Sequence, residues 1–405
     1  MNNIKKINRF LFSVFIMAFM FYIIKYPESS TDIVLKGLNL CYIVIIPVIF
    51  PFLLFSRMFM HSSAFRLLGR ILDKPARFLF GVSGEYANAF FMGCVLGFPI
   101  GAKTVREVYL SDKNKNEAER TLAFCNNCSI SFVVSAAGIT VFGSFKTGFY
   151  LFCIQFISAI ITGIIIKFLF KSKTPESPLL KGGGGDKVYD GGLLNFTEII
   201  SESVSGILNI CGTVLFFFIV TNVLFEYLKS LPILADLLSP EKHGFFFGTA
   251  KTLISGTFEI SSGVYSLIKF NISMQYKLIL SSIILSWTGI SVHFQIMHIL
   301  KNIDLSLKPY FTGKIIHGII SVLLTVLAFD FIKIINPAEI NETFAGDFPY
   351  YSYPPALNNF DAYTAGLIIT GIISALFSLA TVTIIAVIFY LFEKSLKNGK
   401  KCGMI

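Results

Sequence analysis

The sequence predicts an all-α polytopic membrane protein, with about eight transmembrane helices and two re-entrant helical hairpins in an inverted-topology repeat. The 405 residues are 54% hydrophobic and only 14% charged, whereas soluble domains carry about 25% charged residues. Apolar runs of roughly 18 or more residues recur along the chain, and each is long enough to cross a bilayer. Basic residues collect between these runs, mostly on one side, as they do in cytoplasmic loops of membrane proteins.

The net charge of +10 therefore reflects membrane topology, and we expect the lipid bilayer, with no nucleic acid, as the partner. The sequence lacks a P-loop, and His293 and His298 have neither the spacing nor the acidic neighbour of a zinc peptidase motif. Cys125 and Cys128 lack the context of a redox pair, which favours a packing role. We predict no enzyme activity, no metal site and no cofactor other than a coupling ion.

Hydropathy and charge divide the chain into six parts. We expect an uncleaved signal anchor with a cytoplasmic N-terminus, a first repeat, a flexible cytoplasmic linker rich in Gly, Pro and Lys, a second repeat, an acidic external loop, and a last helix with a basic cytoplasmic tail. Their ranges are 1–32, 33–170, 171–198, 199–335, 336–361 and 362–405.

The two repeats share one order of elements: a span, a broken hairpin, and two further spans. The first repeat has spans at 33–55, 121–142 and 148–170, with a basic loop at 57–77 and a hairpin at 80–102. The second has spans at 199–228, 277–300 and 314–335, with a hairpin at 244–268. Because basic segments flank the first hairpin on both sides, it enters and leaves by one face. The first repeat then starts outside and the second inside, an arrangement that many secondary transporters use.

The first hairpin is interrupted by the motif GFPIG at 97–101. Pro99 has no backbone N–H and suits the first turn of a helix. A half-helix that starts there would direct its positive N-terminal end into the membrane, where it attracts anions, and Lys103 would add a cation. Gly97 and Gly101 permit close approach of a ligand. The alternative is a packing kink, with Lys103 reaching the cytoplasmic surface.

The second hairpin is interrupted near Glu259. Spacing places Gly256, Glu259 and Gly263 on one helical face. An ionisable residue at membrane depth is a functional candidate, so Glu259, with Ser261 beside it, is predicted to bind a coupling Na⁺ or H⁺. Alternatively, Glu259 caps a half-helix that begins at Gly256. The two roles are compatible.

A polar stripe follows each hairpin. The stripes comprise Asn127, Ser131, Ser135 and Gly138 in the first copy, and Ser282, Ser286, Gly289 and His293 in the second. Such stripes avoid lipid, so they line a cavity or pack on another helix. The nearby Asn126, Ser129, Trp287 and Gln295 favour a cavity. His293 on its own is equally compatible with a buried, hydrogen-bonded histidine.

Four motifs in this order resemble a known family: GFPIGAK (97–103), FCNNCSISF (124–132), GTFEISSG (256–263) and WTGISVHFQ (287–295). The chain resembles sporulation integral membrane proteins of the YlbJ type, also called SpoVV, over about 35–335. These belong to the nucleoside-recognition or "Gate" domain group, which is similar in design to concentrative nucleoside transporters.

The resemblance implies a secondary transporter of dipicolinic acid, a small anionic substrate, in the outer forespore membrane. Gly97, Pro99, Gly101 and Lys103 would bind its carboxylates, Asn126, Asn127, Ser129, Trp287, His293 and Gln295 would line the cavity, and Glu259 with Ser261 would bind the coupling ion. A carrier of nucleosides or other metabolites and a non-transporting scaffold of a sporulation complex are the alternatives. The sequence leaves open whether the chain forms a homo-oligomer.

Overall fold

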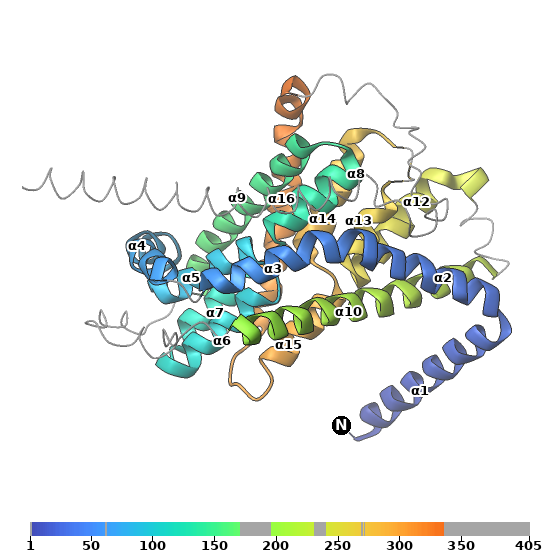
Figure 1. Ribbon diagram of the computed structural model, residues 1–405, viewed down its shortest axis with the longest axis horizontal. Helices are drawn as coiled ribbons and strands as arrows, with labels where there is room; N and C mark the ends of the chain where they lie inside the picture. The colour runs from blue at the N-terminus through green and yellow to red at the C-terminus, as the bar shows by residue number, and fades with distance from the viewer. Residues whose placement is uncertain are drawn as a thin grey trace, which may run out of the picture.

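The computed structural model describes residues 2–60, 63–170, 196–230, 240–268, 270 and 272–335. Every regular element in these residues is a helix (Figure 1). Four apolar segments are long enough to cross a membrane, namely Phe145–Leu169, Phe196–Leu228, Met274–Ile299 and Lys308–Phe329. The all-α membrane class is thus confirmed. Residues 171–195 of the linker predicted at 171–198, the loop at 336–361 and the last helix and tail at 362–405 lie outside the described residues. Residues 196–198 of the predicted linker are instead the start of a helix.

The described helices fall on both sides of the predicted linker. Before the linker they are α1 (Asn2–Lys25), α2 (Pro27–Asn39), the π-helix η1 (Leu40–Ile45), α3 (Ile46–Met60), α4 (Ser63–Phe80), α5 (Gly84–Val95), α6 (Ile100–Asp112), α7 (Lys115–Leu122), the π-helix η2 (Phe132–Ile139), α8 (Thr140–Phe142) and α9 (Phe145–Leu169). After it come α10 (Phe196–Ser230), α12 (Pro240–Phe258), α13 (Ile260–Ser266), α14 (Met274–Trp287), α15 (Ile290–Ile299) and α16 (Lys308–Ile335).

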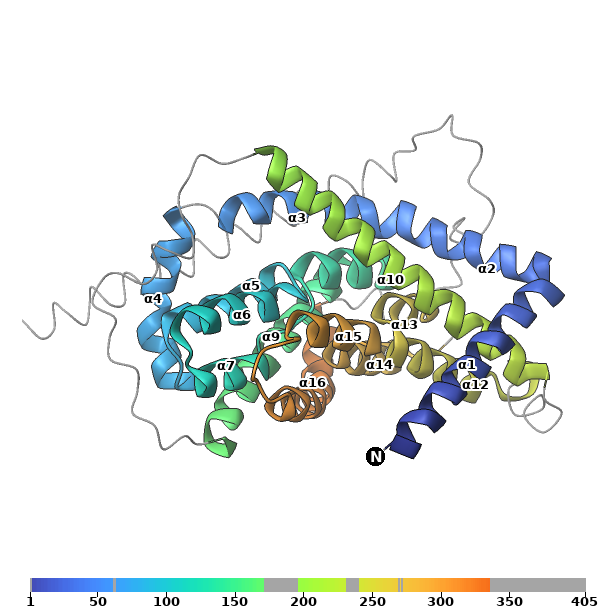
Figure 2. The ribbon, with the colours of Figure 1, turned by 90° about the horizontal axis from the view of Figure 1, so that it is seen from below.

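The first long element of each copy lies in an outer layer. Helices α2, η1 and α3 run end to end along one side of the bundle and are crossed by α10 (Figure 2). Apolar side chains fill the crossing, with Ile45 and Leu53 packed against Ile207 and Val214. The remaining helices of both copies form the inner bundle beside this layer.

The prediction of a basic loop at 57–77 is wrong, because most of this segment forms the amphipathic helix α4. Its apolar residues recur every four positions, at Leu68, Leu72 and Ala76, and so share one face that packs on the bundle. On the polar side, Asp73 pairs with Arg77 over 3.1 Å. The basic segment that follows the first hairpin, residues 103–120, is likewise mostly helical, in α6 and α7.

Two sets of contacts define the opposite ends of the inner bundle. At one end Lys115 pairs with Asp304 over 2.8 Å, and Arg120 donates to the carbonyl of Phe170 just after α9. At the other end Val141 packs with Phe270, which follows the second hairpin. Helix α9 connects the two ends. The two hairpins therefore approach from opposite ends of the inner bundle.

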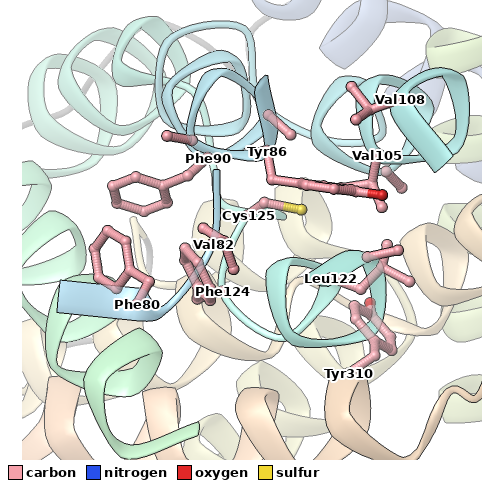
Figure 3. Packing of buried hydrophobic residues seen from close by; sticks show 14 of the residues in the cluster. Phe80, Val82, Tyr86, Phe90, Val105, Val108, Leu122, Phe124, Cys125 and Tyr310 are labelled. Carbon is pink, nitrogen blue, oxygen red and sulfur yellow. The ribbon is translucent and has the colours of Figure 1, made fainter. Parts of the chain in front are cut away.

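An aromatic cluster anchors the first hairpin to the rest of the bundle (Figure 3). The ring of Phe124 lies 4.7 Å from that of Phe80 and 5.3 Å from that of Phe90. Tyr310 of α16 extends the same core. The cluster thus joins α4, α5, the segment after α7 and α16.

The last helix of each copy, α9 and α16, packs against the other through small polar residues. Ser158 and Thr162 on α9 recur 163 positions later as Ser321 and Thr325 on α16. Gln155 donates to the Ser321 hydroxyl over 2.6 Å. Small side chains let helices approach closely, and their hydroxyls form hydrogen bonds away from lipid.

Candidate functional site

The interruption of the first hairpin lies where the sequence predicts it. Helix α5 ends at Val95, a turn follows, and α6 starts at Ile100. Gly97 in this turn has φ of +80°, and a Cβ there would lie 2.9 Å from the backbone nitrogen of Ser129. Glycine is therefore required both by the backbone conformation and by the close approach of the segment that follows α7.

The span predicted at 121–142 is not continuous, because the chain is unwound between α7 and the turn that precedes η2. Asn127 therefore does not share a helical face with Ser131. Two side chains accompany the unwinding: Asn126 donates to the carbonyl of Leu122, and Asn127 donates to that of Phe124 over 2.8 Å. These bonds satisfy carbonyls that a continuous helix would have paired.

The span predicted at 277–300 is also interrupted. Thr288 and Gly289 have φ of +70° and +84° and separate α14 from α15. The predicted stripe from Ser282 to His293 is thus divided between two helices. A Cβ on Gly289 would lie 3.1 Å from the carbonyl oxygen of Phe258, at the break of the second hairpin. In each copy, then, the unwound span contacts the hairpin break of the same copy.

Glu259 itself caps α13, which begins at the next residue. Its carboxylate accepts hydrogen bonds from the backbone N–H groups of Ser261 at 3.0 Å and Ser262 at 2.7 Å, and its side chain is buried. The predicted cap at Gly256 is wrong, because Gly256 lies inside α12. Gly256 and Gly263 do not continue one helical face: they meet across the break, where a Cβ on Gly263 would lie 2.3 Å from the Gly256 Cα.

Both half-helix N-termini are closed by a side chain of the protein. The side-chain oxygen of Asn126 accepts from the N–H of Ala102, in the first turn of α6, over 2.9 Å. Glu259 performs the same task for α13. These groups occupy N–H donors that would otherwise attract an anion. The first turn of α6 is consequently a less open anion site than the sequence suggests.

A cavity of about 50 Å³ lies between the two hairpin breaks. One wall carries the polar side chains of Ser129 from the first copy and of Glu259, Ser261, Ser291 and Gln295 from the second, together with the apolar Leu96, Phe98, Phe132, Ile260 and Val292. The other wall is mostly apolar and comes from α3 and α10 of the outer layer, with Ile49, Leu53, Ile210, Thr213 and Val214. A volume of this size accommodates a few water molecules. A dicarboxylate would need the two walls to separate.

Five of the predicted site residues line this cavity, and seven do not. Gly97, Ser129, Glu259, Ser261 and Gln295 line it, whereas Pro99, Gly101, Lys103, Asn126, Asn127, Trp287 and His293 do not. Lys103 is exposed on α6. A Cβ on Gly101 would lie 2.3 Å from the carbonyl oxygen of Cys125, so this glycine serves helix packing. Whether any of the twelve contacts a substrate stays a prediction.

His293 is buried among aromatic rings. Its Nδ1 lies 2.6 Å from the hydroxyl of Tyr310, and the Trp287 ring packs edge-on at 4.5 Å between centroids. The Trp287 indole donates to the carbonyl of Thr257 over 3.3 Å. These contacts fit a structural histidine that is hydrogen-bonded through Nδ1, while its buried Nε2 has no hydrogen-bond partner among the described residues.

Lys314 on α16 is a polar residue of this region that sequence reasoning missed. Its side chain is 3% exposed, and its ammonium donates to the backbone carbonyl of Asn126 and, over 3.4 Å, to that of Ser286. The predicted span began at residue 314 and so placed this lysine at the membrane boundary. The apolar segment that starts at Lys308 was the available signal that Lys314 lies inside the helix.

Comparison with known proteins adds one match. No protein-family profile matches the chain, and no solved structure does. The chain is 26% identical to the "Sporulation integral membrane protein YlbJ" of Bacillus subtilis (strain 168), in an alignment that covers 99% of this chain and 100% of that protein. The chain is similar to a YlbJ-type protein along its whole length. This similarity and the long apolar helices support a multi-pass integral membrane protein.

Proposed function

We propose that the protein is a secondary transporter that moves a small anionic metabolite, with dipicolinic acid as the favoured cargo, across the outer forespore membrane. The similarity to the YlbJ-type protein supports a membrane role in sporulation. The observation that carries the transport proposal is the convergence of interrupted helices from both copies on one cavity.

Interrupted helices favour transport over a scaffold. Unwound backbone at membrane depth is tolerated only where protein or water satisfies its polar groups. Many secondary transporters bind their substrates at such interruptions, at the interface of inverted repeats. A scaffold gains nothing from interrupted helices whose freed backbone groups are paired by the side chains of Asn126, Asn127 and Glu259, since continuous helices would pair their own backbone groups.

The two walls of the cavity suit an aromatic dicarboxylate and also suggest how access alternates. Hydroxyl and amide groups of Ser129, Ser291 and Gln295 can bind carboxylates, while Leu53 and Val214 offer an apolar surface to a ring. Because the outer-layer wall is mostly apolar, the inner bundle can slide along it without breaking directional hydrogen bonds. Movement of the inner bundle against α3 and α10 would enlarge the cavity for the substrate.

Glu259 couples transport to protons in this proposal. An anion that enters the cavity meets the Glu259 carboxylate, and two like charges in a water-poor site repel each other strongly. Protonation of Glu259 removes this repulsion. Substrate and proton would therefore bind together, as in a proton–anion symporter.

Reconstitution in proteoliposomes tests the function directly. Under an imposed pH gradient we expect accumulation of labelled dipicolinate but not of labelled uridine. Gln295→Ala, which alters the cavity wall, should reduce uptake, whereas His298→Ala, on the exposed side of the same helix, should not. Uptake of uridine alone would identify a nucleoside carrier. Folded protein that moves none of the tested solutes would favour the scaffold.

A further inference from the structure

The ammonium of Lys314 lies where the unwound spans of the two copies meet. One carbonyl partner belongs to Asn126, in the unwound segment after α7. The other belongs to Ser286, one residue before the end of α14. A direct contact between the spans lies beside it, because the Cys128 thiol is 3.1 Å from the carbonyl oxygen of Leu285. A single positive charge thus joins the two interrupted helices.

A cation is favoured at this junction of the two unwound spans. The last carbonyls of a helix have no partner within the helix and carry partial negative charge. The Asn126 carbonyl lies in the unwound backbone after α7, and the Ser286 carbonyl lies in the last turn of α14, so carbonyls of both broken spans meet at the ammonium. In transporters built from discontinuous helices, unwound carbonyls and half-helix C-terminal ends coordinate Na⁺ or a proton. Lys314 supplies a positive charge to this region from the chain itself.

Two glycines of α16 allow the helix to pack closely enough for Lys314 to reach both carbonyls. A Cβ on Gly313 would lie 2.2 Å from the carbonyl oxygen of Ala123, so α16 contacts the unwound segment directly. One turn further, a Cβ on Gly318 would lie 3.4 Å from the hydroxyl of Ser286. Close packing at Gly313 and Gly318, on either side of Lys314 in α16, therefore fixes the position of the lysine.

Within the part of the chain that the structure describes, Lys314 forms no ion pair with a carboxylate. A charged group inside a membrane protein is costly and is retained where it has a task. The two carbonyl partners indicate that this task is to hold the two broken spans together.

We propose that Lys314 is a tethered cation that takes the place of a metal ion at the junction of the two unwound spans. Transport then requires no Na⁺ at this junction, and its coupling is left to the proton. The consequence for coupling rests on the proposed function. The role of the lysine in holding the junction is independent of the cargo.

Thermal unfolding of the full-length protein in detergent tests the junction without a substrate. The melting temperature is compared in NaCl and in choline chloride at equal ionic strength. We expect the same value in both salts for the wild type, because the site already holds its cation. Lys314→Met removes the charge but keeps the apolar stem. It should melt several degrees lower, and NaCl should restore part of the loss. Lys308→Met, at the exposed start of the same helix, should behave as the wild type does.

Uptake measured in Na⁺ and in choline separates this inference from the proposed function. Equal uptake by the wild type in both salts supports the inference. Stabilisation of the wild type by Na⁺, or uptake that requires Na⁺, would overturn it while leaving transport intact. A Lys314→Met protein with wild-type stability and uptake would also overturn it. Absence of uptake with the expected unfolding pattern would reject the transport function and keep the tethered cation.

Discussion

The side-chain oxygen of Asn126 accepts a hydrogen bond from the backbone N–H of Ala102 over 2.9 Å, so an unwound segment of the first copy closes the half-helix of the first hairpin. Glu259 closes the corresponding half-helix of the second copy from within its own hairpin. The two copies thus solve one physical problem, unpaired N–H groups at a helix start, with a neutral amide in one case and a titratable group in the other. This difference assigns proton coupling to the second copy in our proposal.

Removal of the amide cap should destabilise the fold. Asn126→Ala leaves the Ala102 N–H buried without its acceptor and removes the donor to the Leu122 carbonyl. We expect a loss of about 1–2 kcal/mol in the free energy of unfolding, seen as a lower melting temperature in detergent. Asn39→Ala, at an exposed position of α2, is the matched control and should melt as the wild type does. Equal melting of both variants would show that the cap contributes nothing.

Two substitutions separate the capping role of Glu259 from its coupling role. Glu259→Gln keeps a side-chain oxygen that can accept from Ser261 or Ser262, whereas Glu259→Ala leaves both N–H groups unpaired. We expect Ala to cost about 2 kcal/mol or more of stability, and Gln to cost clearly less. The Gln protein should still exchange labelled for unlabelled substrate but should lose accumulation driven by a pH gradient. Full proton-driven accumulation by Glu259→Gln would leave Glu259 as a cap alone.

The glycines around the first hairpin break should be intolerant of any side chain. A Cβ would lie 1.5 Å from the Cys125 carbonyl oxygen at Gly93 and 2.3 Å from it at Gly101. Gly93→Ala and Gly101→Ala should therefore lower the yield of monodisperse protein in size-exclusion chromatography. Gly212→Ala should not, because no heavy atom lies within 4 Å of its added Cβ. Normal folding of Gly101→Ala with lost transport would instead indicate that substrate approaches this glycine.

Lys103 provides a test between the sequence-based site and the observed geometry. Because its side chain is exposed on α6 and does not line the cavity, we expect Lys103→Met to transport a dianion and a monoanionic analogue as well as the wild type does. The measurement is the Michaelis constant for each substrate in proteoliposomes. A selective loss of affinity for the dianion would restore Lys103 to the carboxylate site.

The two ends of the bundle should face opposite sides of the membrane. Lys113 and Lys301 lie within three residues of the Lys115–Asp304 pair at one end. At the other end, Lys146 and Ser273 closely follow Val141 and Phe270 in the sequence. Single cysteines at these four positions, in a cysteine-free protein, should react with an impermeant maleimide from two different sides. We expect the first pair to label only from the cytoplasm and the second only from outside. Labelling of all four from one side would contradict the inverted repeat.

Much of the architecture could be predicted from local properties of the chain. Long apolar runs form helices because lipid offers no hydrogen bonds to the backbone, and this places α9, α10 and α16 close to their predicted ranges. The hairpin break at Gly97 was also predictable, since Pro99 cannot continue a helix hydrogen-bond ladder. Charge patterning predicts an inverted arrangement of the two hairpins, which stays a prediction.

The site depended on contacts that no local pattern contains. Periodicity predicts a continuous helix through Asn127 and through Gly289, because a polar stripe looks the same whether the helix continues or unwinds. Unwinding is favourable only because neighbours from elsewhere in the chain satisfy the freed groups: Lys314 reaches the carbonyls of Asn126 and Ser286 from more than 25 residues away in sequence. Lys103 and Lys314 are the same residue type, and the sequence alone does not show which of them is buried. Only the packing of α16 through Gly313 places one of them at the junction of the unwound spans, while the other stays on the surface.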